Sequence, residues 1–368
     1  MRDVLERLDC WQRDGEKIAL ATLVQVHGSA PRLPGARMLV TASGQMAGSV
    51  SGGCVEADIV TRALQVLADG VPVLARYGIA DDSELAVGLT CAEIEVFIEP
   101  FRETSAWSAA RAAIARHEPA VMALALDPPA VAGAGLTIGA DGSVAGSLGP
   151  ELDRTVTPTA TTMLGTGAMS LLTVEQSDGN TALVFVQAMA PPDRLVISGG
   201  THTAVVLAAM AKRIGMHVTV VEARSAYLRR ERFPDVDALL HASPGKALAA
   251  IDLRGAFVVT LTHDLKHDVP ALAAALRGGA AYVGAMGSLK THALRCAALA
   301  EQGVAAEDLA RIRTPIGLDL GSETPEEIAV AVLAEMLAVR SGRDARPLRD
   351  HGAVHDDTRA RRAASRTA

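Results

Sequence analysis

The sequence predicts an α/β protein in two parts: an N-terminal α/β domain with a degenerate internal duplication and a C-terminal doubly wound parallel sheet. The sequence of residues 39–50 resembles that of residues 136–148, which indicates a duplicated unit. After residue 194, strand-like apolar runs alternate with helical periods, a pattern typical of a parallel sheet covered by helices. Hydrophobic residues make up 49% of the chain and aromatic residues only 3%, so Ala, Val and Leu must build the interior.

Length, charge and cysteine content narrow the class of protein. The 368 residues suffice for two or three domains, and the net charge of −7 argues against a general nucleic-acid binder but not against a small anionic ligand. No apolar run reaches the length of a membrane span and residues 1–6 carry no secretory signal, so we expect a cytoplasmic protein. The cysteines lack C-x-x-C spacing, which argues against a disulfide framework or structural zinc. They are Cys10, Cys54, Cys91 and Cys296.

The N-terminal domain is expected to span residues 1–188, as two units of about 1–100 and 101–188. Apolar periodicity predicts its elements. These are helices over 3–14, from 55 onward and over 107–116, and strands over 18–26, 39–41, 46–47, 94–98, 121–126 and 183–186. Residues 150–180 are weakly patterned. Pro150 stands where the first unit has its cysteine and helix, so we expect the second unit to lack that helix.

The segment Ser49-Val-Ser-Gly-Gly-Cys-Val-Glu56 joins a predicted strand to a predicted helix. Gly52 and Gly53 can bring bare backbone N–H groups to the helix start, where the dipole favours an anion. Cys54 is expected in the first helical turn, a position that favours the nucleophilic or ligating thiolate. The segment therefore predicts an anion cradle beside an activated thiol. The alternative is a tight turn with a buried, inert cysteine.

After a boundary at Pro191-Pro192-Asp193, a Rossmann-like domain is expected over residues 194–340. Its strands are predicted at 194–198, 216–222, 256–262 and 280–284. Its helices are predicted after the turn at 199–204 through about 214, and at 269–277, 290–302 and 325–340. Residues 341–368 are rich in Arg, Asp and Ala without apolar periodicity, which predicts a disordered tail.

The turn after the first strand of this domain matches part of a dinucleotide-binding fingerprint. Gly199 and Ala204 occupy the first and third small positions, and Glu222 ends the next strand, where an acidic residue binds ribose. Thr201 replaces the middle glycine, and its β-branched side chain would crowd a pyrophosphate. The candidate cofactor-binding residues here are Gly199, Gly200, His202 and Glu222.

Three further loops are expected at the carboxyl edge of the sheet, where open α/β sheets bind ligands. Residues 262–268 carry groups for proton transfer, cation binding or phosphate contact, or alternatively form a helix cap with solvated charges. Residues 284–292 are rich in glycine beside a lysine and suit an anion, and residues 315–321 carry one titratable group. The candidates are His263 and Asp264 as catalytic residues and Lys266, Asp268, Gly287 and Asp319 as cofactor-binding residues.

Together these segments resemble the XdhC/CoxI family of accessory proteins for molybdenum hydroxylases, over roughly residues 18–99 and 194–340. In the first domain the resemblance is carried by Gly28-Ser-Ala-Pro-Arg32, Pro34-Gly-Ala-Arg-Met38, Gly48-Ser-Val-Ser-Gly-Gly-Cys-Val-Glu56 and Gly88-Leu-Thr-Cys91. In the second it is carried by Leu261-Thr-His-Asp264 with Lys266 and Asp268, Tyr282-Val-Gly-Ala-Met-Gly-Ser288, Pro315-Ile-Gly-Leu-Asp319 and Thr324-Pro-Glu-Glu-Ile328.

The resemblance implies a protein that binds the molybdenum cofactor (molybdopterin), protects it during sulfuration and passes it to an apo-hydroxylase such as a xanthine or carbon monoxide dehydrogenase. The phosphate of the pterin suits the glycines before the helix, and a thiolate of Cys54 or Cys91 could hold the molybdenum. Arg32 and Arg37 could contact phosphate or oxo groups. Glu56 either joins Cys54 as a catalytic residue or complements the helix dipole.

Two positions depart from the family pattern. The family continues its second cysteine motif as Cys-Gly-Gly, whereas Cys91 is followed by Ala92-Glu93, and Thr201 stands in place of a glycine. Both positions lie at turns expected to face a ligand, so a shift of ligand or reaction stays open.

Three functions therefore compete. The first is a non-catalytic carrier of molybdenum cofactor, expected as a homodimer with an apo molybdenum hydroxylase and a cysteine desulfurase as partners. The second is a metal- or thiol-dependent hydrolase of a small polar molecule, which would bind a divalent metal or use a thiol nucleophile. The third is an NAD(P)-linked oxidoreductase, with Thr201 against it. The hydrolase would draw on Cys54, Cys91, His27, His263 and Asp264.

Overall fold

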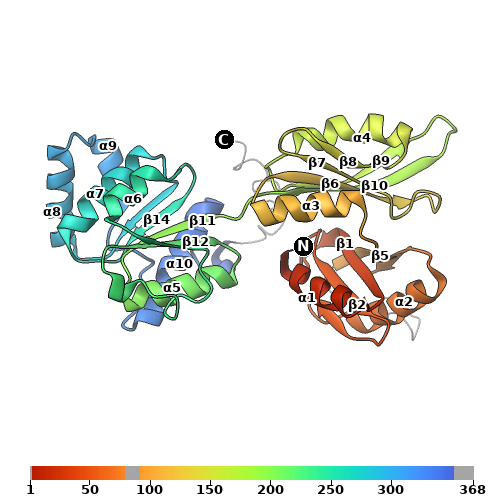
Figure 1. Cartoon of the computed structure of the whole chain (residues 1–368), viewed down its shortest axis with the longest axis horizontal. Helices are drawn as coiled ribbons and strands as arrows, with labels where there is room; N and C mark the ends of the chain where they lie inside the picture. Colours follow the sequence, from red (N-terminus) through yellow and green to blue (C-terminus); the bar gives the residue numbers. More distant parts are fainter. Residues whose placement is uncertain (1, 79–91, 352–368) are drawn as a thin grey trace. The chain divides into compact units, whose positions relative to one another are not determined.

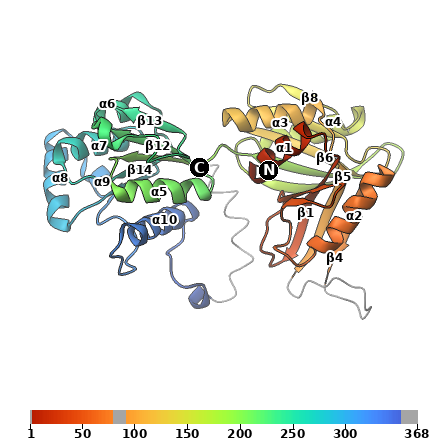
Figure 2. The same cartoon turned by 60° about the horizontal axis from the view of Figure 1, so that its bottom comes forward.

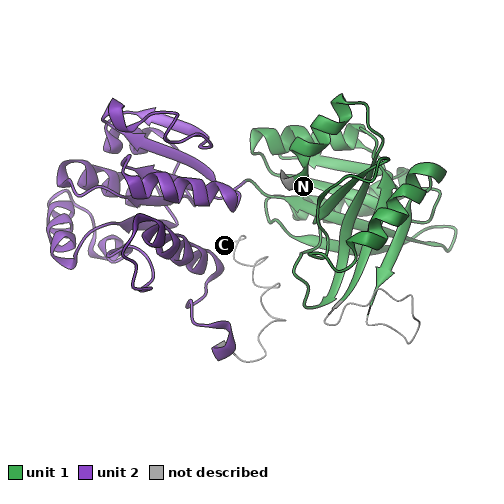
Figure 3. Cartoon of the chain, turned by 90° about the horizontal axis from the view of Figure 1, so that it is seen from below, with its two compact units in different colours: residues 1–191, 353–368 green, residues 192–352 purple. Residues whose placement is uncertain are grey.

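The computed structural model describes residues 2–78 and 92–351 (Figure 1). The chain divides into two compact units, the first ending at Pro191 and the second spanning Pro192–Gly352 (Figure 3), and each is described by itself. None of the helices in these described ranges is long and apolar enough to cross a membrane.

Unit 1 is built from two copies of one α/β arrangement. The first copy consists of α1 (Arg2–Arg13), β1 (Ile18–Gly28), β2 (Arg37–Thr41), β3 (Met46–Gly48), α2 (Glu56–Asp69), β4 (Val73–Tyr77) and β5 (Ala92–Pro100). The second consists of α3 (Ser105–Arg116), β6 (Ala120–Asp127), β7 (Gly135–Gly139), β8 (Val144–Gly146), α4 (Pro150–Thr162), β9 (Met169–Glu175) and β10 (Thr181–Met189). The strand orders β3-β2-β1-β5-β4 and β8-β7-β6-β10-β9 correspond strand for strand, which confirms the duplication.

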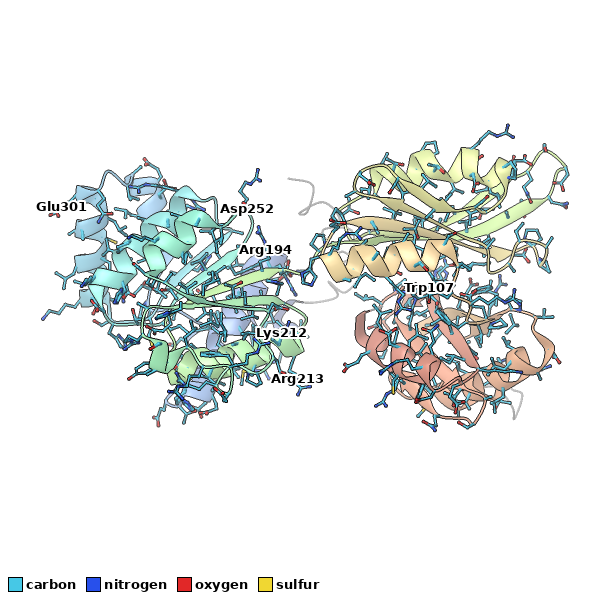
Figure 4. All side chains as sticks on the ribbon, in the orientation of Figure 1. Trp107, Arg194, Lys212, Arg213, Asp252 and Glu301 are labelled. Atoms are coloured by element: carbon cyan, nitrogen blue, oxygen red, sulfur yellow. The ribbon has the colours of Figure 1, made fainter. Side chains whose placement is uncertain are left out.

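The two sheets of unit 1 pack against each other on one face, while α2 and α4 cover the opposite faces. Along β1, Ala21 and Leu23 pack with α2, whereas Leu20 packs with residues of the second copy, as the two-residue period of a strand requires. Trp107 of α3 is buried in this shared core, and Figure 4 shows it on the side of α3 that faces the first copy.

The second copy keeps the helix that we expected it to lack. Helix α4 begins at Pro150, because proline at the first helical position lacks only an N–H that a helix leaves unpaired there in any case. Strand β9 likewise falls within the weakly patterned stretch 150–180. The two copies differ instead in the loop before the helix, which covers residues 49–55 in the first copy and only 147–149 in the second.

Unit 2 contains a six-stranded parallel sheet with the order β13-β12-β11-β14-β15-β16. Its elements are β11 (Arg194–Ser198), α5 (His202–Arg213), β12 (His217–Glu222), η1 (Ser225–Tyr227), β13 (Ala238–His241), α6 (Pro244–Ala250), β14 (Phe257–Thr260), α7 (Leu265–Arg277), β15 (Tyr282–Ala285), α8 (Leu289–Glu301), α9 (Ala306–Leu309), β16 (Ile312–Arg313), α10 (Pro325–Ser341) and η2 (Leu348–His351). Helices α5 and α10 cover one face and α6 and α7 the other (Figures 1 and 2). This order is that of a doubly wound Rossmann-like sheet, as predicted.

Some elements of unit 2 differ from the prediction. Strands β13 and β16 were not predicted, because both lie at the edges of the sheet and neither presents a run of buried apolar residues like those of β14 and β15. Helix α7 begins at Leu265, so Lys266 and Asp268 lie in its first turn and not in a loop. Part of the predicted tail forms η2, and residues 352–368 lie outside the described ranges.

Candidate functional site

The loop between β3 and α2 is organised around the carboxylate of Glu56. Glu56 is the first residue of α2 and is only 8% exposed. Its carboxylate accepts hydrogen bonds from the hydroxyls of Ser49 and Ser51, at 2.7 and 2.5 Å. Five backbone N–H groups of the same loop also donate to it, at 2.9 to 3.3 Å: those of Val50, Ser51, Gly52, Gly53 and Val55.

These hydrogen bonds keep the Glu56 carboxyl ionised. Burial alone raises the pKa of Glu56, but the bonds from Ser51, Ser49 and the backbone outweigh burial and lower the pKa to about 2. A carboxylate that stays ionised and is saturated with donors cannot pass a proton near neutral pH. The geometry therefore assigns Glu56 the ordering of the loop, and its catalytic role stays a prediction.

Gly52 and Gly53 do not form an open anion cradle. Both adopt positive φ, 88° and 119°, and their N–H groups converge as expected, but on the Glu56 carboxylate. The protein thus supplies its own anion where the sequence led us to expect the phosphate of a ligand. The spacing of glycines and helix start predicted an anion at this place, but it could not show that the anion is Glu56.

Cys54 is exposed in this ordered loop, so the alternative of a buried cysteine is wrong. It lies two residues before α2, not in the first helical turn, and its N–H donates to the Ser51 hydroxyl at 3.0 Å. Val50 and Val55, both fully buried, anchor the two ends of the loop. Nε of Arg32 donates to the Ser49 carbonyl oxygen at 3.1 Å, so Arg32 contacts this loop from a separate segment of the chain.

The second copy contains a simpler version of the same arrangement. The carboxylate of Asp153 accepts the Ser147 hydroxyl at 2.6 Å and the Leu148 N–H at 2.7 Å. Ser147 follows Gly146 as Ser49 follows Gly48, so Asp153 corresponds to Glu56. The longer loop of the first copy adds the remaining N–H donors and the cysteine. A serine followed by an acidic residue in both copies is the sequence signal that could have revealed this role.

Arg37, which the family resemblance placed at a phosphate or oxo group, is instead a core residue. Its side chain is 2% exposed, and Nη1 donates to Oε1 of Gln187 in the second copy at 2.9 Å. The guanidinium also lies 5.4 Å from the ring centre of Trp107. Arg37 therefore joins the two sheets of unit 1 and does not face a ligand.

In unit 2, the residues expected to bind a dinucleotide are paired with each other. The N–H of Gly200 donates to Glu222 at 2.8 Å, and Arg224 donates to the same carboxylate from its backbone and its guanidinium. Burial raises the pKa of Glu222, but these bonds, led by that of Arg224, lower it to about 2. Glu222 is 3% exposed, so its oxygens are not presented to a ribose.

Tyr227 covers the same glycine turn. A Cβ atom on Gly200 would lie 2.9 Å from the Tyr227 carbonyl oxygen, and Nη1 of Arg232 donates to the carbonyl oxygens of both residues. The Arg224 guanidinium stacks 4.1 Å from the Tyr227 ring centre. Thr201 caps α5 through its bond with the Ala204 N–H. The turn that would receive a pyrophosphate is thus filled by the protein.

A buried ion pair anchors the segment between β14 and α7. Asp268 accepts the Thr262 hydroxyl and pairs with Arg295 of α8, and both charged side chains are fully buried. Burial raises the pKa of Asp268 against the opposing effects of Thr262 and Arg295. Asp268 is therefore structural, which corrects its expected contact with a ligand. Arg295 was not identified from the sequence, although a charge on an apolar helix face was its signal.

The other predicted site residues of unit 2 lie in segments that follow the parallel strands β11, β14 and β16. His263, Asp264 and Lys266 are exposed at the start of α7, where Asp264 caps the helix, and Asp319 is exposed in the loop after β16. His202 lies 3.6 Å from Glu326 of α10. Cys91 and its motif lie outside the described residues. Within residues 2–78 and 92–351, no three His, Cys, Asp or Glu side chains converge as a metal site.

The fold and site define a class of protein with a duplicated N-terminal unit, an exposed cysteine on an ordered loop, and a Rossmann-like unit. Residues 11–78 match the model of the XdhC and CoxI family, and residues 195–336 match that of the XdhC Rossmann domain. A probable xanthine dehydrogenase subunit of Bacillus subtilis (strain 168) is 30% identical over 341 residues, covering 90% of this chain and 96% of that protein. The chain belongs to the XdhC and CoxI family.

Further relatives match most of this chain. The molybdenum cofactor insertion chaperone PaoD of Escherichia coli (strain K12) is 28% identical over 327 residues, covering 89% of this chain and 84% of PaoD. The uncharacterized protein YqeB of the same strain is 28% identical over 88% of this chain, which spans 43% of the length of YqeB. A crystal structure described as a xanthine dehydrogenase from Bacillus halodurans has a TM-score of 0.74 at 22% identity, covering 94% of this chain and 98% of that one, so the fold is shared.

Proposed function

We propose that this chain binds the molybdenum cofactor (molybdopterin) and delivers it to an apo molybdenum hydroxylase of the xanthine or carbon monoxide dehydrogenase type. The observation that carries the proposal is the exposed thiol of Cys54 on a loop held by Glu56. The name of PaoD, a molybdenum cofactor insertion chaperone, supports the same role.

The chemistry of the loop suits a transient metal contact. A thiolate is a soft ligand that can take an open position of the molybdenum in the cargo. Because Glu56 already fixes the backbone from Ser49 to Val55, Cys54 is presented without the cost of ordering a loop on binding. Cys91 stays a predicted second thiol. The phosphate of the cargo needs other donors, since the N–H groups of Gly52 and Gly53 are occupied.

The test is cofactor content after anaerobic purification and loading with molybdopterin released from a molybdenum enzyme. Molybdenum and the fluorescence of the oxidised pterin are measured on the same samples of wild type, Cys54→Ala and Cys296→Ala. We expect pterin and molybdenum in equal amounts in the wild type, their loss in Cys54→Ala, and no change in Cys296→Ala. Cys296 is a matched control because it is a free thiol on α8 in the other unit.

Two other results of this experiment would contradict the proposal. Equal cofactor content in wild type and Cys54→Ala would remove Cys54 from the site. A first-row metal in stoichiometric amount without pterin would favour the hydrolase. Transfer is tested by mixing loaded protein with an apo-hydroxylase and following the gain of hydroxylase activity, with and without a cysteine desulfurase. Sedimentation analysis tests the proposed homodimer.

The contacts within unit 2 disfavour an NAD(P)-linked reaction, which is the alternative to the proposed carrier role. A dinucleotide would have to displace Tyr227 from Gly200 and Arg224 from Glu222. Each displacement breaks charge-assisted or stacking contacts that the bound nucleotide would have to replace.

A further inference from the structure

Four buried polar atoms of unit 2 lack a hydrogen-bond partner among its described residues, and all four lie along the carboxyl edge of its sheet. Ser198 and Thr260 are the last residues of β11 and β14, and Thr314 directly follows β16. The fourth atom, Nη1 of Arg295, lies beside Gly287 in the loop that follows β15. Buried polar groups in folded proteins are nearly always paired, so this concentration singles out the carboxyl edge of the sheet as the place that receives an external partner.

Arg295 is the strongest donor of the four. Its guanidinium is fully buried, with Nε and Nη2 directed at Asp268 and Nη2 also 3.4 Å from the Thr262 carbonyl oxygen. Asp268 thereby holds one edge of the planar group, and Nη1 is left with two N–H donors. A buried donor without an acceptor destabilises the fold, so these N–H groups favour any acceptor that reaches them.

The guanidinium lies under the N-terminus of α8. A Cβ atom on Gly287 would lie 3.1 Å from Nη1 and 3.5 Å from Cβ of Thr291, and Gly287 has a φ of 133°. Ser288 caps the helix by accepting the Thr291 N–H, which leaves other N–H groups of the first turn without intrahelical partners. Lys290, in that turn, is exposed. The start of α8, with the exposed Lys290 in its first turn, thus lies beside a buried arginine donor.

We propose that this corner of unit 2 binds a phosphate group, with Nη1 of Arg295 and the first turn of α8 as donors and Lys290 at its rim. The site differs from the glycine turn after β11, which Tyr227 and Glu222 occupy. The proposed anion site thus follows β15, the fifth strand of unit 2, and not β11, its first strand. The proposal does not depend on the cargo of unit 1.

Phosphate binding is tested with the full-length chain by titrating inorganic phosphate at constant ionic strength, followed by thermal unfolding and phosphorus NMR. The expected result is saturable stabilisation that chloride does not reproduce. Arg295→Lys keeps a positive charge beside Asp268 but lacks the second amino group, so we expect phosphate affinity to fall about tenfold or more. Arg254→Lys, at a largely exposed arginine before β14, is the matched control and keeps wild-type affinity.

Two further variants test the proposal if Arg295→Lys does not fold: one changes an exposed residue, and the other adds a single methyl group. Lys290→Ala alters the rim without touching the core, and Gly287→Ala places a methyl group against Nη1. We expect both to weaken binding, by about threefold or more. Stronger binding of adenosine monophosphate than of inorganic phosphate, with the same dependence on Lys290, would assign the site to phosphate esters. Absence of saturable stabilisation in the wild type, or equal affinity in all variants, would overturn the proposal.

Discussion

Asp153 in the second copy of unit 1 holds the place of Glu56 in the first, and each carboxylate accepts the hydroxyl of the serine that follows the third strand of its copy. Asp153 accepts that hydroxyl and one backbone N–H, whereas Glu56 also gathers the further N–H groups of a longer loop. The same scaffold therefore carries a plain helix start in one copy and an ordered, cysteine-bearing loop in the other.

This relationship predicts unequal effects of two matched substitutions. Glu56→Gln removes the charge that several donors share, and we expect it to lower the free energy of unfolding by about 2 kcal/mol. Asp153→Asn affects only two bonds and should cost less. Urea unfolding of both variants measures the difference. Equal losses would mean that the extra bonds of the first loop do not stabilise the fold.

The same carboxylate predicts a dependence of stability on acid. The pKa of Glu56 is about 2 in the folded protein and lies near its ordinary value in the unfolded chain. Its contribution is therefore fully present above the unfolded value and disappears as the pH falls towards 2. The difference in unfolding free energy between wild type and Glu56→Gln should shrink between about pH 5 and pH 2. A difference that stays constant over this range would contradict the shift.

Glu99 of β5 predicts the opposite trend at higher pH. It is buried, its Oε1 has no partner among the described residues, and burial raises its pKa to about 8 against the nearby charges of Arg37 and Arg102. The folded state keeps a proton that the unfolded chain has already lost, so stability should fall as the pH rises from the unfolded pKa through 8. Glu99→Gln should remove this loss, about 4 to 5 kcal/mol, in unfolding experiments near pH 8.5.

The buried pair of Asp268 and Arg295 is predicted to matter far more than an exposed pair of the same kind. Asp268→Ala leaves a buried guanidinium without its anion, and we expect a loss of about 3 to 5 kcal/mol. Asp252→Ala breaks the exposed contact with Arg254 and should change the unfolding midpoint little. Thermal unfolding compares the two variants. A small effect of Asp268→Ala would show that Arg295 finds another acceptor.

Much of the fold followed from local sequence patterns. The apolar run along β1 and the helical spacing after Val55 identified the first copy, and the similarity of residues 39–50 to residues 136–148 identified the duplication. These patterns are local, because a strand or helix that faces a core shows its period in neighbouring residues. Helix α4 differs from the expectation because Pro150 stands at the one helical position where proline is favourable and does not break the helix.

The sequence by itself determined the two-part architecture, the family, and the position of Cys54 between two glycines and a helix. Only the tertiary structure decided what meets those groups: Glu56 fills the N–H cradle, Tyr227 covers Gly200, and Arg295 lies under Gly287. The physical reason is that periodicity records which face of an element is apolar, whereas the pairing of a buried polar atom depends on the group that the folded chain brings within hydrogen-bonding distance.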